Sequence, residues 1–115
     1  MTSDSHLSGA ASELIAEELN IVLVSAVSAW EIATKIRLGK LPAAQSLVQD
    51  FVPDLERHNI RILAITADHG LRAGLLPGPH KDPFDRMLIA QALIENLPIV
   101  SNDRVFDGYG VERLW

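Results

Sequence analysis

The sequence contains no cysteine among its 115 residues. Disulfide bonds, thiolate zinc sites, iron–sulfur clusters and cysteine nucleophiles are therefore excluded together. Only oxygen and imidazole ligands are left for a metal ion, and no pair of histidines has the spacing of a zinc site.

Long apolar runs are also absent. No uncharged stretch approaches the ~18 apolar residues that a membrane-spanning helix needs. Residues 1–6 have neither the basic nor the apolar region of a signal peptide, so we expect a cytoplasmic protein without a membrane partner. Because 48% of the residues are hydrophobic, a chain of this length can bury one core. We expect a single domain over residues 1–115.

Positive charge is scarce, and the formal net charge is −5. This balance argues against a protein that binds a nucleic-acid duplex by covering its phosphates with lysine and arginine. It does not exclude a nuclease that holds the scissile phosphate through a divalent cation, because such a site needs carboxylates and the ion supplies the positive charge. The glycine motifs of nucleophile elbows and phosphate-binding loops are missing as well.

Apolar periodicity and capping residues predict an alternation of helices and strands. We expect strands over residues 21–24, 60–65, 97–101 and 111–114. We expect helices over residues 7–19, 28–38, 42–55, 67–75 and 83–93, with the third kinked or divided at Pro53. The expected N-caps are Ser28, Thr66 and Asp82, and Gly39 is expected just past the end of the second helix.

This alternation indicates an α/β fold. Strands separated by helices imply right-handed crossovers and a parallel sheet covered on both faces, in three α/β/α layers. Sites in such sheets lie beyond the carboxyl ends of the strands. That rule selects Glu31 in the helix after the first strand, Asp85 at the start of the helix before the third, and Asp103 just after that strand.

Three converging carboxylates would repel one another, so such a cluster is stable mainly when a hard cation such as Mg²⁺ or Mn²⁺ offsets the repulsion. The ion would bind phosphate oxygens and lower the pKa of a bound water, which makes phosphodiester hydrolysis the leading chemistry. Asp82 lies three residues before Asp85 on the same helix face, where it would orient a water or bind in the outer coordination shell.

Each acid also has a purely structural interpretation. Glu31 stands three residues after Ser28, the spacing of a capping box, and taken singly this interpretation is the stronger one. Asp82 before a proline is an N-cap first and a ligand second. Asp85 lies in a first helical turn, where the macrodipole favours any acid. Asp103 follows a strand, where aspartate commonly forms a turn. The functional signal is their joint placement.

Other polar residues near these acids have weaker signals. Ser101 would hydrogen-bond a carboxylate or the phosphate, although serine at a strand end more often caps. Arg86 and Arg104 each follow a proposed ligand and are well placed to hold a phosphate. His80, in a loop rich in proline and glycine, is interpreted as an exposed loop histidine rather than a ligand.

The basic residues of the second helix and the aromatic residues of the chain have structural interpretations as well. Three basic residues near the end of the second helix indicate a solvated face matched to the helix dipole, with RNA or partner contact as the sharper alternative: Lys35, Arg37 and Lys40. Three aromatic side chains are expected to be packing residues: Trp30, Phe84 and Trp115.

Four blocks of sequence together resemble VapC-like PIN-domain ribonuclease toxins. They are VSAVSAWEI at 24–32, IRLGKL at 36–41, HKDPFDRMLIAQA at 80–92 and LPIVSND at 97–103. The resemblance covers nearly the whole chain. It implies a metal-dependent endoribonuclease, the toxin of a type II toxin–antitoxin pair, which cuts RNA until a cognate antitoxin protein blocks it.

The resemblance also implies roles for individual residues. Glu31, Asp85 and Asp103 match the family's metal-binding acids, and Ser101 stands where threonine or serine is usual. Mg²⁺ or Mn²⁺ is the implied cofactor. A homodimer is the implied assembly.

The chain departs from the family's pattern at its beginning. Members of this subgroup start with a central strand that ends in an Asp-Thr-His type motif, whose aspartate is a metal ligand. That strand is absent here, and Asp4 is no substitute because no apolar strand precedes it. The expected fold therefore lacks its first central strand, which should expose the edges of the neighbouring strands. A late start codon, a fragment or a decayed gene would each explain the difference.

Three functions remain open at this point. The first is the ribonuclease, acting on single-stranded or looped RNA. The second is a catalytically inactive PIN-like interaction module that binds an antitoxin without cleaving RNA, and the missing first aspartate favours it. The third is a Mg²⁺-dependent phosphohydrolase or receiver-like domain, which would not predict the Trp-Glu-Ile and Asp-Pro-Phe-Asp-Arg blocks together.

Overall fold

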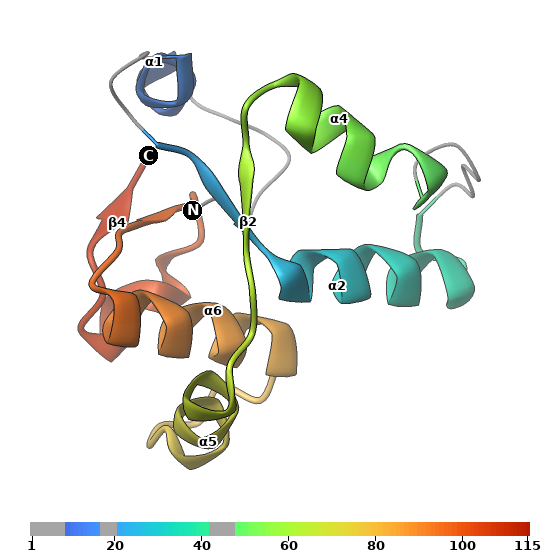
Figure 1. Ribbon diagram of the computed structural model, residues 1–115. Helices are drawn as coiled ribbons and strands as arrows, with labels where there is room; N and C mark the ends of the chain where they lie inside the picture. The colour runs from blue at the N-terminus through green and yellow to red at the C-terminus, as the bar shows by residue number, and fades with distance from the viewer. Residues whose placement is uncertain (1–8, 17–20, 42–47) are drawn as a thin grey trace.

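A computed structural model of the chain describes residues 9–16, 21–41 and 48–115 (Figure 1). The elements in order are α1 (Gly9–Ala16), β1 (Leu23–Ser25), α2 (Ala26–Arg37), α4 (Phe51–Arg57), β2 (Arg61–Leu63), α5 (Ala67–Leu75), α6 (Pro83–Glu95), β3 (Ile99–Val100), the 3-10 helix η1 (Arg104–Tyr109) and β4 (Arg113–Leu114). The expected order of helices and strands is confirmed within these residues. The expectations for residues 1–8, 17–20 and 42–47 lie outside them.

The N-cap of helix α2 lies three residues earlier than the sequence predicted. Its N-cap is Ser25, whose hydroxyl accepts a hydrogen bond from the Val27 N–H, so the assignment of Ser28 as the cap is wrong. The end of α2 is as expected. The N–H groups of Gly39 and Lys40 donate to the carbonyls of Ile36 and Lys35, and Gly39 has φ +74°. This is the Schellman ending, in which glycine avoids the steric cost of a left-handed residue.

The remaining helix starts follow local chemistry. Thr66 caps α5 through a capping box in which its hydroxyl accepts from the His69 N–H and the His69 ring accepts from the Thr66 N–H. Asp82 caps α6 by accepting from the N–H groups of Phe84 and Asp85, with Pro83 first in the helix. Pro53 lies in the first turn of α4, where a missing N–H costs no helical hydrogen bond.

All strand pairing is parallel. Strand β1 pairs with β2, with Val24 opposite Ile62, and β3 pairs with β4, with Ile99 opposite Arg113. This pairing confirms the α/β class. The four strands form two separate pairs rather than one continuous sheet, and the described residues contain no strand that joins the pairs.

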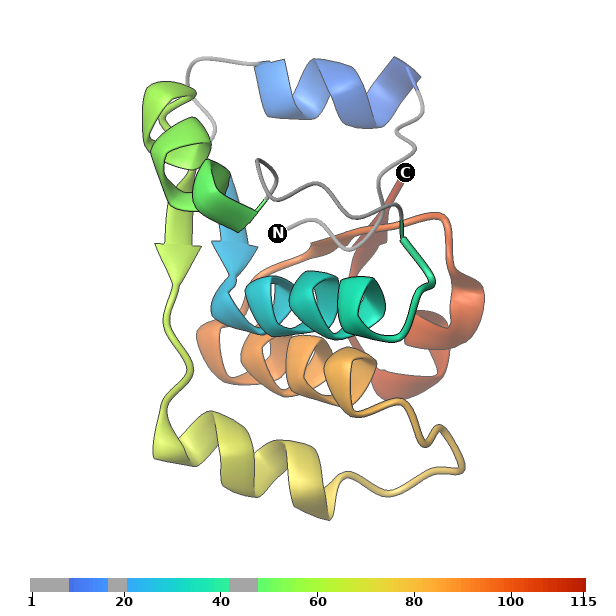
Figure 2. The same ribbon diagram turned by 90° about the vertical axis from the view of Figure 1, so that its right-hand side faces the viewer.

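The helices that matter for the site are packed in a row. Figure 2 shows α2 running beside α6, with α5 on the far side of α6. Helix α6 is the centre of the core, and Leu88 and Ile89 are fully buried within it. They pack with residues from α2, β3, η1 and the segment after α5: Val27, Ile99, Phe106 and Leu76.

A buried polar network ties these elements together. The Ser25 hydroxyl donates to Gln91 Oε1 at 2.5 Å, and Gln91 Nε2 donates to the Ala64 carbonyl at 3.3 Å. Gln91 Nε2 also lies 3.4 Å from His69 Nδ1. Because that nitrogen accepts from Thr66, the ring proton is on Nε2, which donates to Glu95 at 2.9 Å. The network fixes the N-terminus of α2, the end of β2 and α5 on α6.

No helix within residues 9–16, 21–41 and 48–115 has both the length and the apolar character that crossing a membrane requires.

Candidate functional site

The site lies where α2 and α6 run side by side. The rings of Trp30 on α2 and Phe84 on α6 meet edge to face, with centroids 4.6 Å apart and planes at 70°. Glu31 and Asp85 are the next residues along the two helices. The packing therefore places two of the sequence-predicted acids on neighbouring helices, close enough for the charge of Glu31 to raise the pKa of Asp85.

Glu31 lies in the interior of α2 and not in its first turn. With the N-cap at Ser25, the Ser28 capping box that offered a purely structural explanation for Glu31 does not form. The carboxylate instead lies 2.9 Å from Lys35 Nζ, one turn further along the helix. The hydrogen bond that Lys35 donates to Glu31 raises the pKa of Lys35.

Asp85 is the acid whose surroundings are most unusual. Burial raises the pKa of this carboxyl group, a hydrogen bond from His80 opposes the shift, and the charges of Asp82 and Glu31 raise the pKa further. His80 Nε2 lies 2.8 Å from Asp85 Oδ2. A half-buried carboxyl group with two acidic neighbours is the arrangement that a bound cation would relieve.

Asp82 has the capping role that the sequence predicted. Its Oδ1 lies 2.9 Å from Phe84 N and 3.2 Å from Asp85 N. Its negative charge nevertheless acts on both Asp85 and Lys35. Asp82 therefore belongs to the electrostatic surroundings of the site as well as to the helix start.

His80 is a correction to the sequence analysis, which interpreted it as an exposed loop residue. Its side chain is 25% exposed and contacts Asp85. The loop holds it there because the His80 N–H donates to Tyr109 Oη at 3.2 Å and the His80 carbonyl accepts from Arg86 Nη1 at 3.0 Å. The structural context of this histidine depends on η1, which is distant in sequence.

Arg86 has a structural set of partners. Besides the His80 carbonyl, its guanidinium donates to the carbonyls of Ala73, Gly74 and Leu76. These bonds secure the end of α5 and the loop that leads to α6. Most of its donors are thus used within the protein, which leaves Arg86 less available to a phosphate than the sequence suggested. Arg104 lies exposed at the start of η1.

Asp103 and Ser101 form a local turn after β3. The hydroxyl of the buried Ser101 accepts from the Asp103 N–H at 3.0 Å, and Asp103 Oδ1 accepts from the Val105 N–H at 3.0 Å as the N-cap of η1. The described part of the chain contains no group of three or more acidic or histidine side chains close enough to hold a metal ion. The structure thus relates Glu31, Asp82 and Asp85 through the action of their charges on one another, and the metal-binding roles of Glu31, Asp85 and Asp103 stay predictions.

Trp30 packs against the Phe84 ring, as expected of a packing residue. Its side chain is nevertheless 57% exposed on the surface of α2. Nothing in the spacing of a single tryptophan indicates exposure. The only sequence feature that could have drawn attention to this tryptophan is that Trp30 directly precedes Glu31, one of the acids selected together with Asp82 and Asp85 at the start of α6.

A comparison with protein families agrees with this architecture. The family model described as PIN domain matches residues 1–112. The chain belongs to the PIN-domain family. PIN domains have an α/β fold and are typically metal-dependent nucleases. No curated protein matched the chain.

Proposed function

We propose that this PIN domain is a Mg²⁺- or Mn²⁺-dependent endoribonuclease and the toxin of a type II toxin–antitoxin module. The observation that carries the proposal is that Glu31 and Asp85 each follow one of the two rings that join α2 and α6, with burial and acidic neighbours raising the pKa of Asp85. Structural capping does not explain Glu31, and the fold does not favour the ionised form of Asp85. Within the protein Glu31 pairs with Lys35 and Asp85 with His80, and a bound cation would offset the remaining repulsion between the acids.

The donor set of the site fits a hard divalent cation. Mg²⁺ is commonly held by one or two carboxylates, with waters and substrate phosphate oxygens completing its octahedron. Glu31 and Asp85 would supply those carboxylates, with Asp82 in the outer shell and Asp103 as a further ligand. When bound, the ion would neutralise the phosphate and supply an activated water.

The chain's own residues orient these donors. Lys35, 2.9 Å from Glu31, fixes that carboxylate by a charge-assisted contact. His80 holds one oxygen of Asp85 and leaves the other for a ligand. Arg104, exposed at the start of η1, is left to contact RNA near Asp103, while the buried Ser101 hydroxyl holds the Asp103 turn.

The toxin role is proposed from the four sequence blocks that resemble VapC-like toxins, and it includes a cognate antitoxin protein as inhibitor and a homodimer as assembly. The second candidate is an inactive PIN-like module that binds the antitoxin without cutting RNA. It is favoured by one observation, namely that the described residues hold no three-ligand cluster.

Cleavage of labelled RNA distinguishes the two candidates. The chain should cut RNA in Mg²⁺ or Mn²⁺ and not in EDTA, and Glu31→Gln, Asp85→Asn and Asp103→Asn should each abolish cutting. Asp68→Asn is the matched control, since Asp68 is an exposed acid on α5 away from the site. Absence of cutting by a folded chain, or equal cutting by all variants, would contradict the ribonuclease proposal.

A further inference from the structure

We propose that the Trp30–Phe84 pair is a stacking platform for an unpaired RNA base beside the scissile phosphate. The inference rests on the proposed ribonuclease function and deepens it. It assigns a base-binding subsite to two aromatic residues whose sequence pattern indicated only packing.

The exposure of Trp30 is the first observation. Its side chain is 57% exposed, although tryptophan is highly buried on average in folded proteins. The ring is not loose, because its edge-to-face contact with Phe84 fixes its orientation. Phe84 in turn packs against the core cluster. A ring that is already ordered can stack on a base at little further cost in conformational entropy.

The position of the pair relative to the acids is the second observation. Successive residues in a helix are separated by about 1.5 Å along the axis. Trp30 precedes Glu31 and Phe84 precedes Asp85, so each acid directly follows one ring of the pair along its own helix. A strand whose phosphate lies at the acids therefore has its neighbouring bases within reach of the rings.

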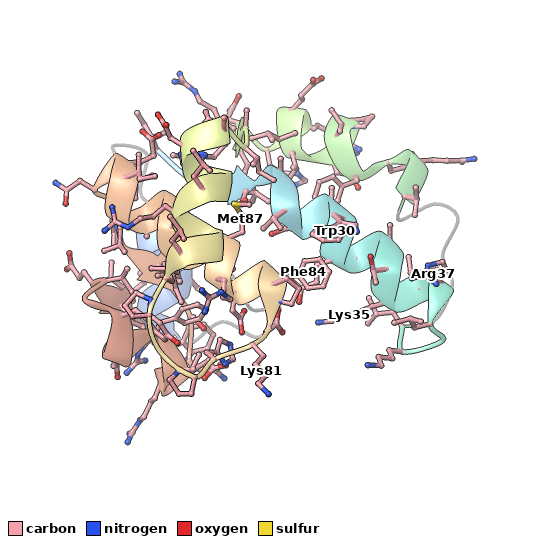
Figure 3. The ribbon with its side chains drawn as sticks, turned by 90° about the horizontal axis from the view of Figure 1, so that it is seen from below. Trp30, Lys35, Arg37, Lys81, Phe84 and Met87 are labelled. Carbon is pink, nitrogen blue, oxygen red and sulfur yellow. The ribbon has the colours of Figure 1, made fainter. Side chains whose placement is uncertain are left out.

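Charge on the same face is the third observation. Figure 3 shows Lys35 and Lys81 on the side of the molecule that carries Trp30 and Phe84, with Arg37 further along α2. The Lys35 side chain is 45% exposed, and Lys81 is exposed in the loop before α6. Cations that follow a backbone beside an aromatic platform are the usual combination in sites for single-stranded nucleic acid.

A protein partner would also cover an exposed tryptophan, but the chemistry around this one favours RNA. The rings are flanked by lysines and lie beside the carboxylates that the proposed reaction needs. Because every base has a π face, such a platform would accept single strands with little sequence preference, and would reject a duplex, whose bases are already stacked.

The test uses the fluorescence of Trp30 in EDTA, where the proposed cleavage cannot occur. Trp115→Phe leaves Trp30 as the only tryptophan of the chain. Single-stranded RNA oligonucleotides should quench its emission, and an RNA duplex of the same sequence should not. In a separate binding titration, Trp30→Ala should weaken single-strand binding about 5- to 140-fold, equivalent to about 1–3 kcal/mol at about 1.4 kcal/mol per factor of ten.

Two variants complete the experiment. Trp30→Phe keeps an aromatic ring and should retain most of the affinity. Leu75→Ala removes an apolar side chain that is 80% exposed on α5, and should bind RNA as the parent does.

Equal binding by Trp30→Ala, or unquenched emission with bound RNA, would overturn the subsite even if the chain cleaves RNA. The subsite would also be overturned by an antitoxin that forms a stable complex through Trp30 and leaves RNA binding unaffected. Quenching without any cleavage in Mg²⁺ would retain the subsite and contradict the proposed nuclease function.

Discussion

The buried network around Gln91 gives a quantitative prediction about how the site is held. Gln91 is fully buried and accepts from the Ser25 hydroxyl, which is itself fully buried. Gln91→Leu keeps the approximate volume but leaves that hydroxyl without its acceptor, at a cost of about 1–3 kcal/mol. The substitution also removes the amide that donates to the Ala64 carbonyl. This adds little to the cost, because Ala64 is exposed and water can replace the amide. We expect the free energy of unfolding to fall by about 2 kcal/mol.

A double-mutant cycle isolates the hydrogen bond. Ser25→Ala alone removes the N-cap of α2 and should cost about 1 kcal/mol for the lost cap. The double variant Ser25→Ala/Gln91→Leu has no stranded hydroxyl, so its loss should be smaller than the sum of the single losses by about 1–2 kcal/mol.

Urea unfolding is the assay, since a slope of about 2 kcal/mol per molar turns the Gln91→Leu loss into a midpoint shift of about 1 M. Gln49→Leu, at an exposed position, is the control and should change the free energy by less than about 0.5 kcal/mol. Strictly additive losses in the cycle would refute the proposed network.

Three further predictions concern the site and the core. Asp85→Asn should raise the thermal midpoint at neutral pH. Because the pKa of Asp85 is higher in the folded state than in the unfolded state, its contribution to stability is most favourable at acid pH and is lost as pH rises through the folded pKa. A lower midpoint of the variant at neutral pH would contradict this. Thr66→Ala should cost about 1 kcal/mol by removing the capping box of α5, measured by urea unfolding, while an unchanged midpoint would show that α5 does not need the cap. Phe106→Ala should lower the free energy of unfolding by about 3–5 kcal/mol, because the ring is 1% exposed in the core. A decrease below about 1 kcal/mol, measured by calorimetry, would place Phe106 outside the core.

The helix ends that local chemistry controls were predictable from the sequence. Thr66, Asp82 and Gly39 act within three residues of themselves, so their side-chain or backbone preferences are enough to locate a helix boundary. The start of α2 was not predictable in this way. Ser25 and Ser28 are both acceptable caps, and Ser25 has its hydroxyl fixed by Gln91, which is 66 residues away in sequence.

The rule for parallel sheets selected Glu31 and Asp85, and the structure places them on the packed helices α2 and α6, while their role as ligands stays a prediction. The surroundings of these acids could not be predicted from the sequence. The contact of His80 with Asp85 depends on how Tyr109 and Arg86 hold a loop, and no local pattern reports such a contact. The exposure of Trp30 likewise depends on which face of α2 the rest of the chain covers.

The most direct test of the central claim is the binding of Mn²⁺ to the chain, followed by the loss of the free-ion signal in electron paramagnetic resonance. The account predicts binding that weakens at least tenfold in Glu31→Gln and in Asp85→Asn, and that is unchanged in Asp68→Asn. The Asp103→Asn variant, measured in the same series, decides whether that acid is a ligand. Mn²⁺ binding by Glu31→Gln and Asp85→Asn that equals binding by the parent chain would contradict the assignment of these carboxylates to a metal site.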